Sequence, residues 1–216
     1  KRTSSESLAG LLRDFVGLGD PDAKVTVLDL SSIPFDVHPT VTAQIGRLAF
    51  EFNYWNPRCR EFPLFLVAEE AHAYIPRAHV GGHQGTRRSF ERIAKAGRKY
   101  AVGLCVVSQR PNELSETVLS QCSTFVCLRI TNPDDQEYVR ALVPDAARGL
   151  LETLTSLAQG EAIATGEGVP IPVRFRVTMP DPPPNAQDIE YAHMWARGPQ
   201  ETDVEHIVDC WRRQRR

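Results

Sequence analysis

The sequence has few features that mark a specialised class of protein, and each absence excludes something. No apolar run approaches the roughly 20 residues that span a bilayer, so we expect no membrane partner. Basic and acidic residues nearly balance, at 25 and 27, and the net charge of −2 excludes a global basic field for nucleic acid. The five cysteines include no C-x-x-C pair, which disfavours zinc and indicates a reducing, cytoplasmic setting. The chain begins with Lys1 and not with Met, so we expect a fragment of a longer protein.

The chain does contain short apolar runs that alternate with amphipathic stretches. The runs that indicate strands lie at residues 24–30, 64–68, 101–107 and 124–130. Helices are indicated at residues 40–55, 87–100, 189–195 and 204–211, and behind Asn132, the expected N-cap of a helix that begins at Pro133. The run LFLVA at 64–68 is apolar at every position, so we expect a strand buried on both faces.

This alternation predicts an α/β fold with a mainly parallel sheet flanked by helices. Residues 161–165 and 172–178 indicate a β-hairpin at the end of that domain, for which we expect the bounds 1–179. The proline-rich run PDPPP opens a second region, 180–216, made of a linker and a helical basic tail. Ligands of such sheets bind outside the carboxyl ends of the strands, so chemistry is expected directly after the apolar runs.

Two acidic residues, Glu69 and Glu70, directly follow the run at 64–68. Adjacent carboxylates at the end of a buried strand are costly unless they have partners, and a bound Mg²⁺ and a water molecule would provide them. In phosphoryl transfer, one acid holds the water shell of the metal and the other orients or deprotonates the attacking water. The alternative is a strand that simply reaches solvent at a Glu-Glu turn.

The run at 101–107 ends in Ser108, Gln109 and Arg110. A glutamine amide can donate to a phosphate oxygen or to an attacking water, and it can accept from that water. Gln109 is therefore a candidate for positioning the water, and Ser108 and Arg110 are candidates for contacting a nucleotide. The alternative is a polar exit turn that Pro111 terminates. Two such strand ends in the expected order favour the chemical interpretation.

Three stretches, at residues 62–76, 91–111 and 118–136, carry a family resemblance. They read FPLFLVAEEAHAYIP, ERIAKAGRKYAVGLCVVSQRP and VLSQCSTFVCLRITNPDDQ. They resemble the HerA-type DNA translocase ATPases, in the HerA/FtsK branch of the RecA-like P-loop motors. The resemblance covers roughly residues 24–177. It implies ATP and Mg²⁺ as cofactors, a homo-hexameric ring, double-stranded DNA as substrate, and a nuclease or other effector as partner.

The resemblance also implies roles for single residues. Glu70 matches the water-activating Glu of the Walker B motif, and Glu69 matches the acidic residue beside it that binds Mg²⁺ through water. Gln109 matches the sensor residue after the next strand. Arg98 matches the position expected to reach the nucleotide of a neighbouring subunit, as an arginine finger.

One departure from the family pattern concerns phosphate binding. The motif G-x-x-x-x-G-K-[ST], whose backbone amides and lysine hold the phosphates, is absent from the sequence. In the family that loop lies upstream of the segment corresponding to residues 24–30. We therefore expect an incomplete core without the first strand and the phosphate loop, which by itself should not hydrolyse ATP. The alternative is a degenerate relative that never had the loop.

The helix expected at residues 87–100 carries a basic stripe made of Arg88, Arg92, Lys95 and Lys99. The plainest interpretation of the stripe is a solvated face. At 3.6 residues per turn, Arg98 would point about 80–100° away from it, which is in line with a separate role.

The glycine-rich segment that leads into this helix carries further arginines. In a ring motor it would face the pore and place Arg77, Arg87 and Arg88 against DNA phosphates. The alternative is a flexible surface loop without a ligand.

Together these features predict the later part of an ATP-driven, hexameric double-stranded DNA translocase or helicase. Two alternatives remain open. A conjugation- or packaging-type DNA pump shares this core, and a non-catalytic ring scaffold would only dock a nuclease. The sequence upstream discriminates among them, because a scaffold would have no phosphate loop there.

Overall fold

The structure is a computed structural model that describes residues 7–20, 22, 24–34, 36–77, 84–183, 190–198 and 201–213. The chain divides into two compact units, Lys1–Arg176 and Val177–Arg216. The second unit contains α7 (Tyr191–Ala196) and α8 (Val204–Arg213), close to the two helices predicted there. Within the described ranges, no helix is long and apolar enough to cross a membrane.

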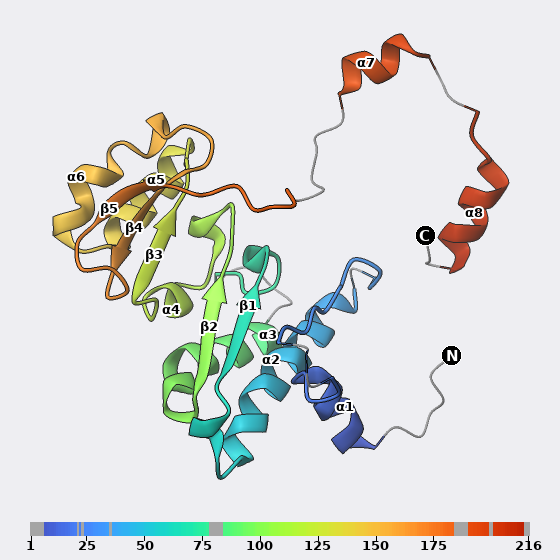
Figure 1. Ribbon diagram of the computed structural model, residues 1–216, viewed down its shortest axis with the longest axis horizontal. Coiled ribbons are helices and arrows are strands. Elements are labelled where there is room, and N and C mark those ends of the chain that lie inside the picture. The colour runs from blue at the N-terminus through green and yellow to red at the C-terminus, as the bar shows by residue number, and fades with distance from the viewer. Residues whose placement is uncertain are drawn as a thin grey trace. The chain divides into compact units, whose positions relative to one another are not determined.

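Two parallel strands, β1 (Leu64–Ala68) and β2 (Val102–Val106), form the centre of the first unit. Helices α2 (His38–Trp55) and α3 (Gln84–Ala96) pack against one face of this pair, as Figure 1 shows. Phe50 of α2, Ile93 of α3 and Val102 of β2 are buried together between the layers. Burial of such side chains is the main force that fixes the helices on the strands.

A second sheet is antiparallel, with the strand order β3 (Thr124–Cys127), β4 (Glu161–Gly166) and β5 (Val173–Arg176). The predicted hairpin is thus confirmed as β4 and β5. Helices α5 (Pro133–Leu142) and α6 (Arg148–Leu151) supply Val139 and Leu151 to a core shared with Cys127 and Ile163. Burial raises the pKa of the Cys127 thiol to about 11, because the thiolate is disfavoured in this apolar core.

Asn132 caps α5 as predicted. Its side-chain oxygen accepts hydrogen bonds from the backbone amides of Asp134 and Asp135, at 2.8 and 3.4 Å. The remaining short α-helices of the first unit are α1 (Leu8–Phe15) and α4 (Glu116–Leu119). Single 3₁₀ turns include η2 (Ala71–Ala73), η3 (Gly97–Tyr100) and η4 (Pro111–Glu113).

The α/β class with a parallel pair and flanking helices agrees with the prediction, but two strand predictions were wrong. Residues 24–30 form no strand, and Val27 is 82% exposed, because no described strand lies beside them to share backbone hydrogen bonds. The strand β1 is buried on one face only. Phe65 and Val67 are 71% and 58% exposed, because α2 and α3 cover just the opposite face.

The predicted helix over residues 87–100 is α-helical only as far as Ala96. The next four residues form the 3₁₀ turn η3, and Gly97 at its start packs tightly against β2. A Cβ atom there would lie 2.3 Å from the carbonyl oxygen of Val102, so only glycine fits. The α-helix from which the direction of Arg98 was predicted therefore ends before this residue, which lies in the tighter turn.

Candidate functional site

The register of β1 and β2 brings their two polar carboxyl ends together. Ala68 pairs with Val106, and the amide of Val107 donates to the carbonyl of Ala68 at 2.9 Å. Beyond the strands, the amide of Ala71 donates to the carbonyl of Val107 at 3.0 Å. The turn after β1 is thus fastened to the end of β2, and the predicted site residues of both strands share one edge.

Glu70 and Gln109 are in direct contact at this edge. Gln109 Nε2 donates a hydrogen bond of 2.7 Å to Glu70 Oε1. The other carboxylate oxygen of Glu70, Oε2, is buried and accepts no hydrogen bond within the described part of the chain. A carboxylate offers about four lone-pair sites, so most of the acceptor capacity of Glu70 is unused.

The backbone at Glu70 is unusual. Its φ of 47° and ψ of 43° lie in the left-handed region, where a residue with a side chain costs about 1–2 kcal/mol. Glycine would relieve this cost, but it would remove the carboxylate from the strand end. Backbone strain of this kind gathers at functional sites, so its presence at Glu70 supports a chemical role for the side chain.

Glu69, the neighbouring acidic residue, is exposed, and a hydrogen bond holds its backbone in place. The hydroxyl of Tyr74 donates to the carbonyl oxygen of Glu69 at 2.8 Å. Burial raises the pKa of Tyr74 to about 12, with a further contribution from the charges of Glu69 and Glu70. Tyr74 therefore stays protonated and donating at any physiological pH.

The two carboxylates at this edge are oxygen ligands of the kind that Mg²⁺ takes in proteins. In the described ranges, no group of three or more His, Cys, Asp or Glu residues is arranged to hold a metal ion. Mg²⁺ usually takes one or two carboxylates and completes its shell with waters and substrate phosphates. Glu69, exposed beside Glu70, suits that arrangement.

Two further predicted residues lie on the loop after β2. Ser108 Oγ accepts a hydrogen bond from the amide of Arg110 at 3.0 Å. The guanidinium of Arg110 donates to Glu113 Oε1 at 2.7 Å, and this carboxylate raises the arginine pKa. This pair uses one of the five N–H donors of the guanidinium, so donors remain for a phosphate.

The structure adds a residue to which the sequence assigned no role. His72 Nδ1 lies 3.1 Å from Ser108 Oγ and 3.3 Å from Glu70 Oε2. The contact with Oε2 is close but does not meet hydrogen-bond geometry, and it is an ion pair only when His72 is protonated. The only signal in the sequence was a polar side chain two positions after Glu70.

Arg98 lies at the other end of the strands. It is exposed in η3, just before β2 begins at Val102, whereas Glu70 and Gln109 lie beyond the carboxyl ends. A five-residue strand at about 3.3 Å per residue separates the two ends by roughly 15 Å. The side chain of Arg98 therefore cannot reach the carboxylates of its own chain.

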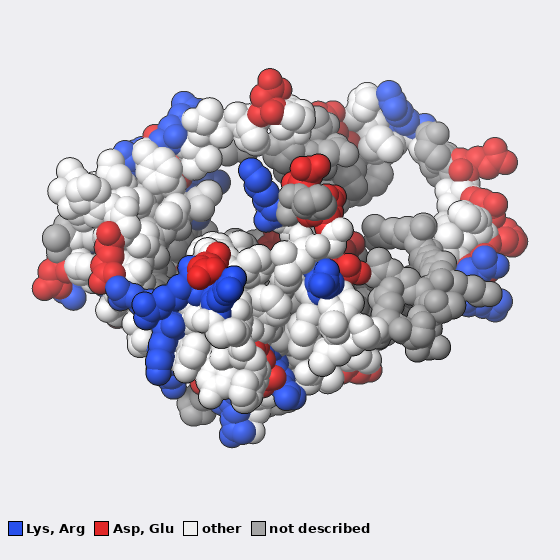
Figure 2. Space-filling model, turned by 60° about the horizontal axis from the view of Figure 1, so that its bottom comes forward, with Lys and Arg blue, Asp and Glu red and all other residues white. Residues whose placement is uncertain are grey.

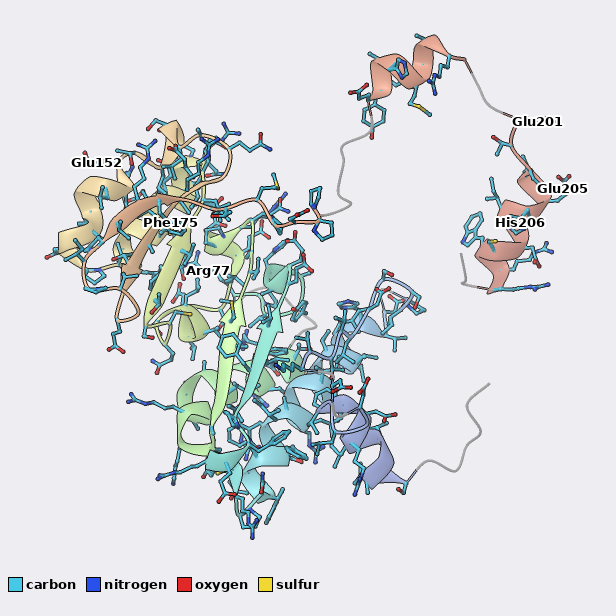
Figure 3. All side chains as sticks on the ribbon, viewed as in Figure 1. Arg77, Glu152, Phe175, Glu201, Glu205 and His206 are labelled. Atoms are coloured by element: carbon cyan, nitrogen blue, oxygen red, sulfur yellow. The ribbon has the colours of Figure 1, made fainter. Side chains whose placement is uncertain are left out.

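The three arginines predicted to contact DNA have different surroundings. Arg77, labelled in Figure 3, pairs with Glu116 and lies 4.7 Å above the centre of the Tyr138 ring. Arg87 pairs with Glu91 at 3.4 Å. Arg88 is exposed on α3, beside a shallow pocket that Arg92 also lines. On the face in Figure 2, Lys and Arg side chains are interspersed with Asp and Glu instead of forming one basic field.

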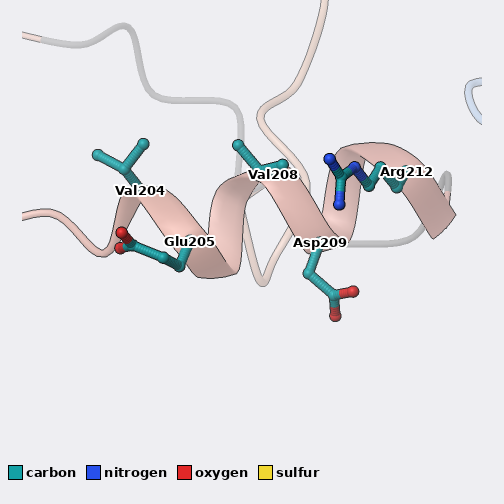
Figure 4. Close-up of a pocket in the computed structure, with 5 residues that line it drawn as sticks. All are labelled: Val204, Glu205, Val208, Asp209 and Arg212. Carbon is teal, nitrogen blue, oxygen red and sulfur yellow. The ribbon is translucent and has the colours of Figure 1, made fainter.

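Another pocket lies on the second unit (Figure 4). Among the described residues, all that line it belong to α8: Val204, Glu205, Val208, Asp209 and Arg212. A surface made by one helix brings no groups together from different elements, so it offers no site comparable to the edge of β1 and β2.

The chain is similar in sequence to proteins named as DNA double-strand break repair helicases. The DNA double-strand break repair helicase HerA of Pyrococcus furiosus is 40% identical over 116 residues, which are 54% of this chain and 20% of that protein. The DNA double-strand break repair helicase HerA of Sulfolobus acidocaldarius is 31% identical over 192 residues, 87% of this chain and 38% of that protein. The chain thus spans about a fifth to two fifths of the length of these relatives.

A solved structure shares the fold. The genome packaging NTPase B204 from Sulfolobus turreted icosahedral virus 2, in complex with ATP-gammaS, matches with a TM-score of 0.52 at 14% identity. The match covers 78% of this chain and 72% of that chain, and it agrees with the predicted α/β fold. In sequence, residues 64–192 match the helicase HerA-like C-terminal family. The matched segment begins at the first residue of β1. The chain therefore belongs to the helicase HerA-like C-terminal family.

Proposed function

We propose that this chain supplies the water-activating part of the ATPase site of a double-stranded DNA translocase or helicase. The observation that carries the proposal is the hydrogen bond between Gln109 and Glu70 at the carboxyl ends of β1 and β2. In sheets of this kind, that edge is where ligands bind. The named relatives are DNA double-strand break repair helicases, which favours a helicase over a packaging or conjugation pump.

In this proposal Glu70 acts as the general base. Its Oε1 is the oxygen that Gln109 contacts, and it would accept the proton of the attacking water. The amide oxygen of Gln109 would accept a hydrogen bond from the same water and so orient it toward the γ-phosphate. Ser108 and Arg110, on the same loop, would contact the nucleotide bound at this edge.

Glu69 would hold Mg²⁺ through its water shell. When bound, the ion neutralises negative charge on the nucleotide phosphates. In this proposal other residues bind those phosphates, since this sequence contains no G-x-x-x-x-G-K-[ST] motif.

Arg98 is proposed to act on the nucleotide of a neighbouring subunit. Its distance from Glu70 within one chain excludes a role in the same site, and its exposed position in η3 leaves it free to meet another subunit. Such a role requires a head-to-tail ring, which for this proposal is a homo-hexamer. The proposal also includes double-stranded DNA as the substrate, contacted by Arg77, Arg87 and Arg88. It further includes a nuclease or other effector as the partner and a cytoplasmic location.

The proposal is tested on the protein expressed from the complete reading frame that encodes this chain. We expect it to hydrolyse ATP, and linear double-stranded DNA to accelerate the turnover measured by phosphate release. Turnover that DNA does not change would contradict the motor function. An absence of both turnover and ATP binding would favour the non-catalytic scaffold.

The 216-residue chain alone gives a second expected result. Because it lacks the phosphate-binding motif, it should show no turnover and no measurable ATP binding by calorimetry at millimolar ATP. Turnover by the isolated chain, lost in the Glu70→Gln variant, would show that the phosphates are held by residues not identified above.

A further inference from the structure

We propose that His72 is a positioning residue that directs the attacking water to one oxygen of Glu70. The inference rests on the proposed function, since it assigns His72 to the same site. It adds a residue that neither the carboxylate pair nor the polar end of β2 indicated.

The first step of the argument is the location of His72. It lies in η2, directly after the left-handed turn at Glu70, and its imidazole reaches across to the loop after β2. Its Nδ1 lies close to polar atoms of both Glu70 and Ser108. The side chain is 21% exposed, so its place between the two loops is largely enclosed.

The second step is the hydrogen bond that fixes the ring. Nδ1 of His72 and Oγ of Ser108 are 3.1 Å apart, and Ser108 Oγ is itself held by the amide of Arg110. A hydroxyl that accepts from one donor can still accept from a second or donate its own proton, so Ser108 can bond either tautomer of the imidazole. The ring is therefore anchored to the β2 loop whichever nitrogen carries the proton.

The third step is the effect of the ring on Glu70. The Glu70 side chain is 47% exposed as a whole, yet Oε2, at 3.3 Å from His72 Nδ1, is buried. The imidazole thus lies against the buried oxygen, so in this proposal Oε1 is the oxygen that receives the water. Because Oε1 is also the oxygen that Gln109 contacts, a water bound there meets the base and the orienting amide together.

This arrangement makes a specific substitution test possible, in the protein from the complete reading frame. His72→Ala removes both the cover over Oε2 and the anchor to Ser108. We expect kcat for ATP to fall about tenfold or more, equivalent to one lost hydrogen bond, with KM for ATP within about twofold of its starting value. His72→Asn keeps a donor on the δ atom of the side chain, so we expect it to recover most of the lost kcat.

A double-mutant cycle with Ser108→Ala tests the anchor. If His72 acts through Ser108, the double variant should be no slower than the slower single variant, because one interaction is lost in each case. The matched control is His193→Ala, which removes an exposed imidazole from α7 and should leave kcat unchanged. Circular dichroism identifies any variant that fails to fold. If His72→Ala fails to fold, kcat of the His72→Asn variant is used for the test instead.

Three results would overturn the inference: an unchanged kcat in His72→Ala, a loss that His72→Asn does not reduce, or a rise in KM that accounts for the whole effect. The Glu70→Gln variant separates this from the proposed function. If Glu70→Gln is inactive while His72→Ala is fully active, only the role of His72 fails. If Glu70→Gln is itself fully active, the proposed site fails.

Discussion

Replacing Glu70 by Gln in the protein from the complete reading frame is expected to reduce ATP turnover by about 10²–10⁴-fold, the range typical of a lost general base. The change keeps the size and the left-handed backbone position of the side chain, and an amide can still bond Gln109. It removes only the capacity to take a proton from water. ATP binding should therefore persist, with a Kd close to that of the unchanged protein.

The measurement combines steady-state phosphate release with nucleotide binding by calorimetry. Glu152→Gln makes the same chemical change at an exposed position on the second sheet's side of the unit (Figure 3), and it should leave turnover unchanged. If Glu70→Gln hydrolyses ATP at the original rate, Glu70 is not the base. If the variant also loses ATP binding, the substitution impairs nucleotide binding and not the activation of the water.

Replacing Arg98 by Ala should reduce turnover by about 10³-fold or more, as for other arginine fingers, if the residue completes a neighbour's site. Arg98 lies roughly 15 Å from the end of the strands that carry Glu70, so this effect requires a second subunit. Lys95→Ala is the matched control, because it removes an exposed cation from the same helix region without touching η3.

Mixing inactive subunits separates a role between subunits from a structural one. In a ring formed from equal amounts of Arg98→Ala and Glu70→Gln subunits, about a quarter of the interfaces combine an intact Glu70 with an intact Arg98. Turnover should return to as much as that fraction of the original. A mixture as inactive as its two components would contradict the action of Arg98 on a neighbour's nucleotide.

The chemistry at the edge of the sheet was largely predictable from the sequence. Apolar runs locate buried strands, and in a parallel pair the residues after each run meet at one edge, so the proximity of Glu70 and Gln109 follows from the pattern of the chain alone. The Asn132 cap was equally predictable, because its hydrogen bonds are local to one turn.

Other features depend on contacts that a linear pattern does not encode. His72 is tied to Ser108, 36 positions away in the chain, through the turn geometry at Glu70. The end of the α-helix before Arg98 was missed because Gly97 packs against Val102 there. The exposure of Val27 and Phe65 could not be foreseen either, since apolar runs predict burial but not which neighbours provide it.

The measurement that tests the central claim most directly is a structure of the complete protein with Mg²⁺ and a non-hydrolysable ATP analogue. The account predicts a water in line with the γ-phosphate, within hydrogen-bonding reach, roughly 2.6–3.2 Å, of Glu70 Oε1, with Gln109 contacting the same water. A γ-phosphate bound away from the carboxyl ends of β1 and β2, with its water held by other residues, would contradict it.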